Sequence, residues 1–296
     1  MSNIPTTKRE LILATAKSLF IEKGFRGTTI AGIAEEAGIA KGSVYSYFTS
    51  KLDIVKALFV QSDEKSQEAV NNLLTTNNTK GSEFLEQYLM CEFKEVLNER
   101  SFIQMFLTDE LIIMDADIMA VLQECRINYH LSQQKVLIKA YDNTITPWIY
   151  DIVSLVNGLL QEYAIYLTLD DANFSIKRCA HLISFFVDNT IKALEKSDLS
   201  PLITKENFPL TQNIDLENLQ QQKAIDILDN IKNNLTDLNE QHKQSVLETV
   251  DLIENELTKT DLNNTLIRAL IANLRPYAEL NHYRRRLAET LDVELI

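Results

Sequence analysis

The chain has 296 residues, of which 45% are hydrophobic and 24% are charged, and its net charge is −13. This is the composition of an ordinary globular protein that is long enough for more than one domain. Its three cysteines are far apart and no CxxC or CxxH spacing occurs, so we expect no disulfide framework, no metal site and no cofactor. No uncharged apolar run reaches transmembrane length, so we expect no membrane insertion.

Only seven glycines and five prolines occur, which favours an all-α fold. The first helix is predicted from Thr7 to Lys23, with Thr6 or Thr7 as its cap and Gly24 as its end. Its apolar positions recur at helical spacing and form one stripe: Ile12, Ala16, Leu19 and Phe20.

Two short helices and the start of a longer one are predicted next. They span Thr29–Ala37 and Ala40–Phe48, with a tight turn at Gly38, and the longer helix begins at Ser50. In the third helix only Val44 and Phe48 are expected to point inward. This pattern is typical of a helix-turn-helix whose third helix enters the major groove of DNA.

The residues around this motif have the chemistry that DNA recognition needs. The first 60 residues carry eight Lys or Arg against five Asp or Glu, so a basic segment precedes an acidic remainder. Small residues at Gly42 and Ser43 allow close approach, and Tyr45 and Tyr47 offer hydroxyls and flat rings.

The blocks "GFRGTT", "IAEEAGIAKGSVYSYF" and "SKLDI" resemble the N-terminal domain of the TetR/AcrR family of bacterial transcriptional regulators over about residues 8–59. The resemblance implies a homodimer on a palindromic operator of double-stranded DNA and a larger helical domain that binds an effector. It also implies DNA contacts for seven residues: Thr29, Lys41, Gly42, Ser43, Tyr45, Tyr47 and Lys51. Lys8 and Arg9 could form an additional arm. Some members read bases with an Arg where Ala31 stands here, so specificity would rest on the third helix alone.

Five helices are predicted in the body of the chain, and they are, in order: Glu83–Asn98, Phe102–Ile113, Ile118–Tyr141, Pro147–Leu169 and Ser175–Lys196. The last two are apolar over more than one face. The resemblance implies that they form a four-helix bundle with a second subunit, whereas the alternative is an intramolecular core.

A small-molecule effector, hydrophobic or cationic, would lie between these helices, because aromatic faces with a buried carboxylate can hold an organic cation. The candidate lining residues are Phe102, Phe106, Glu110, Tyr129, Trp148, Tyr163 and Tyr166. Ordinary core packing is the alternative for each aromatic residue, and a solvated acidic face is the alternative for Glu110.

Residues 196–215 are predicted to form a linker to an additional helical bundle. Two heptad-like stripes follow, made of Ala224, Leu228, Ile231, Leu235 and Leu238 and of Val246, Val250, Ile253 and Leu257. Leu262, Leu266 and Leu270 are expected to start a third helix that Pro276 ends. Three arginines, 284–286, form either a solvated helix end or a contact with a membrane surface, DNA or a protein.

The sequence therefore predicts an all-α protein with a helix-turn-helix domain (1–50), a helical effector and dimerisation domain (51–200) and a C-terminal helical region (201–296). A ligand-responsive homodimeric repressor, cytoplasmic and associated with the nucleoid, is the favoured function. The alternative is a DNA-tethered interaction protein whose C-terminal helices recruit a protein or membrane partner. No catalytic motif is found, so an enzyme is not expected.

Overall fold

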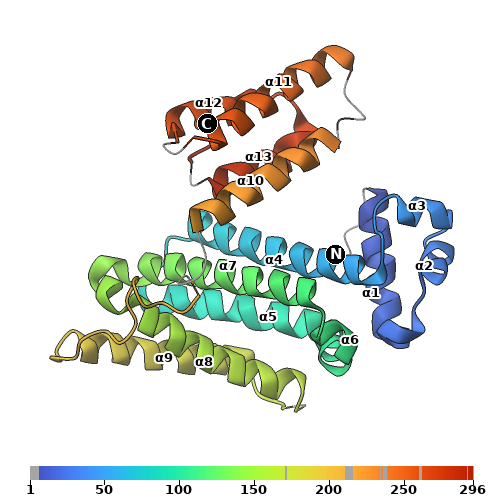
Figure 1. Ribbon diagram of the computed structural model, residues 1–296. Coiled ribbons are helices and arrows are strands. Elements are labelled where there is room, and N and C mark those ends of the chain that lie inside the picture. Colours follow the sequence, from blue (N-terminus) through green and yellow to red (C-terminus); the bar gives the residue numbers. More distant parts are fainter. Residues whose placement is uncertain are drawn as a thin grey trace. The chain divides into compact units, whose positions relative to one another are not determined.

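The computed structural model describes residues 7–295 apart from 171, 211–215, 234, 236–238, 260, 261 and 292. Every regular element in these residues is a helix (Figure 1). The chain forms two compact units, one ending at Phe208 and one starting at Pro209. The expected all-α fold is therefore confirmed. Within the described residues, no helix combines the length and the apolar composition that crossing a membrane requires.

The first unit begins with a small helical head, by which we mean residues 7–58. It contains α1 (Lys8–Gly27), α2 (Ile30–Glu36), α3 (Lys41–Tyr45) and the first turns of α4 (Lys51–Thr76). Thr7 and Glu10 form a capping box at the start of α1, while the other proposed cap, Thr6, lies outside the described residues. Gly24 interrupts the helix with a φ of 72°, a backbone conformation that favours glycine.

The core of the head is made by the stripes that the sequence indicates. Its largest buried members come from all four helices: Ile12, Leu13, Phe20, Ile33, Val44, Phe48 and Ile54. Val55 and Leu58 of α4 belong to the same core, which favours a head that ends after Leu58 rather than at residue 50. The third helix is shorter than predicted, since regular helix ends at Tyr45 and Phe48 follows in a turn.

The remainder of the first unit, residues 59–208, is the body. After α4 its helices are α5 (Gly81–Thr108), α6 (Glu110–Ile113), α7 (Ala116–Tyr141), the 3-10 helix η1 (Asp142–Trp148), α8 (Ile149–Thr168) and α9 (Ile176–Leu194). Helix α5 packs against α7, α8 and α9, and α7 packs along α4 (Figure 1). This arrangement makes α5 the central helix of the body.

Two predicted boundaries in the body are wrong. The sequence predicts separate helices at Glu83–Asn98 and Phe102–Ile113, but α5 is continuous to Thr108, because no Gly or Pro interrupts it. The chain turns at Asp109, whose side chain caps α6. Pro147 does not open an α-helix, since it lies inside η1 and α8 starts at Ile149.

The segment predicted as a linker is attached to the body over its first part. The Asp151 carboxylate accepts hydrogen bonds from the backbone N–H groups of Leu202 and Ile203, at 3.2 and 3.3 Å. Phe208 is buried and its ring lies 4.7 Å from that of Tyr150. Residues up to 208 therefore belong to the first unit, and residues 211–215 lie outside the described part.

The second unit is a helical bundle with its own core. It contains α10 (Leu216–Asn233), α11 (Glu240–Leu257), α12 (Asn264–Asn273), the 3-10 helix η2 (Ala278–Leu280) and α13 (Asn281–Thr290), and consecutive helices pack on one another. Both predicted stripes are buried where they are described, and Leu238 lies outside the described residues. The predicted third helix is α12, which contains Leu266 and Leu270 and ends before Pro276; it buries Ile267, Leu270 and Ile271 and leaves Leu266 exposed.

Candidate nucleic-acid interface

The connection between α2 and α3 has the geometry of a helix-turn-helix. Gly38 takes a φ of 66°, and its N–H donates to the Glu35 carbonyl while the Ile39 N–H donates to that of Ala34. These bonds end α2 and redirect the chain. Helices α2 and α3 then pack against each other, so that one face of α3 is held by the head and the opposite face is free.

The free face of α3 presents the residues predicted to read DNA. Val44 and Phe48 are buried, whereas Tyr45 and Tyr47 are 48% and 46% exposed. Lys41 is exposed and its ammonium lies 5.6 Å from the centre of the Tyr45 ring. A Cβ added at Gly42 would meet nothing within 4 Å, so this position offers open surface. Such a helix can approach the edges of base pairs.

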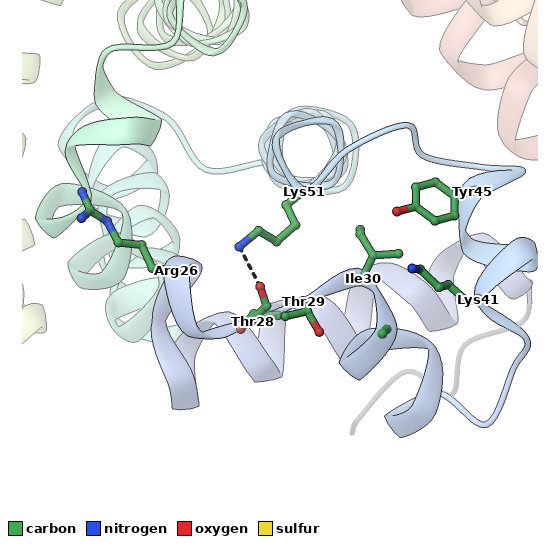
Figure 2. A pocket seen from close by; sticks show the side chains of 8 residues that line it. Arg26, Thr28, Thr29, Ile30, Lys41, Tyr45 and Lys51 are labelled. Carbon is green, nitrogen blue, oxygen red and sulfur yellow. Dashed lines mark hydrogen bonds between the residues drawn. The ribbon is translucent and has the colours of Figure 1, made fainter.

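A hollow of about 310 Å³ lies beside this face (Figure 2). It is lined by Arg26, Thr28, Thr29, Ile30, Ala31, Lys41, Tyr45 and Lys51. Four of the seven predicted DNA contacts thus meet at one place, while Gly42, Ser43 and Tyr47 lie outside the lining. Arg26 was not predicted, although it stands in the "GFRGTT" block. Three basic side chains around one hollow suit a phosphate group.

Two threonines shape the floor of the hollow. The Thr29 hydroxyl oxygen caps α2 by accepting from the Gly32 N–H at 3.0 Å. Thr28 is buried, and its hydroxyl donates to the carbonyls of Leu19 and Gly24. These bonds hold the connection between α1 and α2 in one conformation, and they therefore determine the orientation of the N-terminus of α2.

Lys51 has an internal role that the sequence did not indicate. Its ammonium donates to the carbonyl of Thr28 at 2.6 Å (Figure 2). It also donates to the carbonyl of Phe25 at 2.5 Å and lies 4.4 Å from the centre of the Phe25 ring. Burial lowers the pKa of Lys51, and the Asp109 carboxylate partly opposes this shift. The side chain thus ties the start of α4 to the end of α1. A phosphate contact by Lys51 remains a proposal.

Lys51→Met is expected to loosen the head, because two charge-assisted hydrogen bonds disappear at a cost of about 1–3 kcal/mol. Hydrogen–deuterium exchange of residues 24–29 should rise, and DNA affinity should fall as a consequence. Lys65→Met, an exposed change farther along α4, is the control. Loss of DNA affinity without faster exchange at residues 24–29 would show that Lys51 acts on DNA alone.

Tyr45→Ala is expected to weaken specific DNA binding by about 1–3 kcal/mol and to change non-specific binding little, because a lost base contact affects the recognised sequence only. Fluorescence anisotropy on a recovered binding site and on unrelated DNA measures both. Tyr45→Phe separates the hydroxyl from the ring. Equal losses on both DNAs would contradict a reading role.

The head is joined to the body mainly through the second half of α5. The Lys17 ammonium pairs with the Glu99 carboxylate at 2.5 Å, and Arg26 pairs with Asp109 at 3.7 Å. Phe102 and Phe106 of α5 pack on the head core, and the Lys17 ammonium lies 5.4 Å from the centre of the Phe102 ring. Helix α5 is therefore in direct contact with the head.

The seven residues predicted to line an effector pocket are divided between different packing clusters and the surface. Phe102 and Phe106 pack on the head core, and Glu110 is exposed on α6. Trp148 and Tyr163 pack on the body core, and Tyr166 is exposed at the edge of α8. An effector contact by any of these residues stays a prediction. Tyr129 differs from the other six residues because it lies beside a buried carboxyl group, that of Glu92.

Within the described part of the chain, no group of three or more His, Cys, Asp and Glu side chains is placed to hold a metal ion. The residues that the structure brings together are instead an exposed recognition helix and a basic hollow beside it. They define the class of this protein as a helix-turn-helix protein of the type that docks one helix in the major groove.

Residues 12–58 match the family described as bacterial regulatory proteins, tetR family. YerO, a helix-turn-helix transcriptional regulator of Bacillus subtilis strain 168, is 24% identical over 272 residues, which cover 90% of this chain and 89% of YerO. Residues 12–58 are therefore a DNA-binding domain of the tetR type, and over most of its length the chain is similar to a transcriptional regulator. Because the alignment with YerO is longer than the first unit, it extends into the second unit, so YerO shares part of the C-terminal region.

Solved structures of lower identity share the fold. A transcriptional regulator from Pseudomonas aeruginosa PAO1 matches 64% of this chain and 92% of its own, with a TM-score of 0.55 and 15% identity. FadR from Bacillus subtilis, solved in complex with stearoyl-CoA, matches 61% of this chain and 98% of its own, with a TM-score of 0.51 and 17% identity.

Proposed function

We propose that this regulator is a homodimeric repressor that binds a palindromic operator through α3 and leaves it when a small molecule binds the body. The observation that carries the proposal is the division of α3 and the turn after it into a buried side, with Val44 and Phe48, and an exposed side with Lys41, Tyr45 and Tyr47. The exposed side carries the hydrogen-bonding groups that major-groove reading requires.

An apolar surface on α8 and α9 supports the dimer. Helix α9 buries one face against α5, yet Leu182, Phe185 and Phe186 on α9 are exposed, as are Tyr166 and Leu169 at the end of α8. The two helices lie next to each other (Figure 1). Exposed large apolar side chains on two neighbouring helices are typical of a protein interface, so a second copy of this chain is the proposed occupant.

The body supports a response to a ligand because α5 connects its centre with the head. Arg100 and Gln104 of α5 donate to the Thr168 carbonyl at the end of α8, at 3.0 and 2.6 Å, and Glu99 of α5 holds Lys17 of the head. A ligand that shifts α5 would change the spacing of the two heads and so favour the unbound state.

The experiment is sedimentation of the protein with an operator duplex recovered from genomic DNA. Two chains per duplex and much weaker binding to half of the palindrome are expected. One chain per duplex, with undiminished affinity for half of the palindrome, would contradict the proposal that a dimer binds the operator. Release is tested by adding candidate effectors to the complex and following anisotropy.

A second candidate function is a DNA-tethered interaction protein, and the separate core of the second unit favours it. The test is a chain that ends after Phe208. Ending it earlier, after Asp198, would remove the packing of Phe208 on Tyr150. If the shortened chain dimerises, binds the operator and is still released, regulation does not need the second unit, and recruitment of a partner becomes its proposed role.

A further inference from the structure

Four polar side chains form a cluster between α5 and α7 inside the body. Tyr88 and Glu92 come from α5, and Tyr129 and Gln133 come from α7, each pair four residues apart on one helix face. The two helices pack side by side (Figure 1). Tyr88 and Gln133 are 1% exposed and Glu92 is 9% exposed, while Tyr129 is only partly buried and places the cluster near the surface.

Three polar atoms of this cluster have no hydrogen-bond partner at normal distance and angle. They are the Tyr88 hydroxyl and both the nitrogen and the oxygen of the Gln133 amide. Each buried polar atom without a partner destabilises the fold by about 1–3 kcal/mol. The neighbouring positions Leu85, Leu89 and Val136 are fully buried and apolar, so an apolar side chain would have suited the fold better. Such atoms need an explanation outside folding.

The cluster is also acidic. Burial raises the pKa of Glu92 to about 7, and hydrogen bonding by Tyr129 opposes part of this shift. The remaining charged group that acts on Glu92 is another acid, Glu95. Among the described residues, therefore, no basic side chain compensates the Glu92 carboxylate.

We propose that this cluster is the effector site, and that it takes a ligand with a protonated amine on an apolar or aromatic body. The inference rests on the proposed function. The ammonium would donate to the Glu92 carboxylate and to the Gln133 carbonyl oxygen, while the rings of Tyr88 and Tyr129 contact the apolar part. A ligand with a carboxylate or phosphate in this position is repelled by Glu92 and finds no cation.

The position of the cluster connects binding to the head. Glu92 precedes Glu99 by two turns on α5, and Glu99 holds Lys17 of the head. On the other side α7 packs along α4, which enters the head. A ligand that enters between Tyr88 and Tyr129 must separate α5 from α7, so both connections to the head would move.

Calorimetric titration of the full chain with phenethylamine and with hydrocinnamate tests the proposal, because these probes share a phenyl ring and a two-carbon spacer but carry opposite charges. The amine should bind at least about tenfold more tightly than the acid. Glu92→Gln and Tyr88→Phe should each weaken the amine by about tenfold, since a charge-assisted bond or a hydroxyl contact is lost. Glu68→Gln, an exposed change on α4, should leave binding unchanged.

Absence of amine binding, equal binding of both probes, or binding that neither variant weakens would each overturn the site. Both variants are expected to fold, because one removes a buried charge and the other removes a hydroxyl without a partner; melting curves verify this. Operator binding without any ligand is measured separately. If the protein binds the operator but not the amine, the proposed effector site is wrong and the proposed function is unaffected. If the protein binds the amine but not the operator, the proposed function is wrong.

Discussion

Glu92→Gln is expected to raise the free energy of unfolding of the first unit by about 3 kcal/mol at pH 8, because burial raises the pKa of this carboxyl from 4.5 to about 7. The unfolded chain loses the proton near pH 4.5, whereas the folded chain keeps it up to about pH 7. Stability of the wild-type chain therefore falls as pH rises through this interval, and the difference between variant and wild type disappears below about pH 4.5.

Urea unfolding followed by tryptophan fluorescence measures this difference. Trp148 is the single tryptophan of the chain and packs on the body core, so its emission reports the first unit. Subtracting wild type from variant at each pH removes the contribution of other titrating groups, such as His130, whose pKa is lowered by burial and by Arg126. A difference that does not change between pH 4.5 and 8 would mean that Glu92 ionises normally.

Phe185→Glu is expected to abolish the proposed dimer and to lower operator affinity by about 100-fold or more, because each head would then bind its proposed half-site without the other. Phe185 is 55% exposed, so the change does not disturb the core of a single chain. A buried glutamate in the proposed interface would have no partner and would be strongly unfavourable.

Leu252→Glu on α11 is the matched control, since Leu252 is 54% exposed and lies in the second unit. Sedimentation velocity gives the oligomeric state of both variants. A dimeric Phe185→Glu variant together with a monomeric Leu252→Glu variant would assign the interface to the second unit instead of α8 and α9.

The head could be predicted closely from sequence because its signals are local. Thr7 with Glu10, Gly24 and Gly38 determine helix ends within a few residues, and the stripe from Ile12 to Phe20 defines the buried face. The exposure of Tyr45 and Tyr47 follows once Val44 and Phe48 are placed inside. The seven DNA contacts themselves remain predictions, to be tested by the variants above.

The body could not be predicted to the same depth because its structure depends on contacts between residues that are far apart in the sequence. Near residue 99 only the absence of Gly and Pro indicates that α5 continues, and the contact between Glu99 and Lys17 joins residues 82 positions apart. The aromatic residues proposed for a pocket differ in burial only after packing. Tyr88 and Gln133 were overlooked, although polar pairs at i and i+4 within apolar helix faces were a usable signal. Likewise, only the contact with Tyr150 shows that Phe208 belongs to the first unit.

The central claim is that α3 reads a specific DNA sequence, and capture of genomic DNA tests it most directly. Sheared DNA of the source organism is bound to the purified full chain and to the Tyr45→Ala variant in parallel, and the retained fragments are sequenced. The account predicts a palindromic sequence enriched by the wild-type chain and much less by the variant. Equal enrichment of the same sequence by both proteins, or retention without any common sequence, would contradict it.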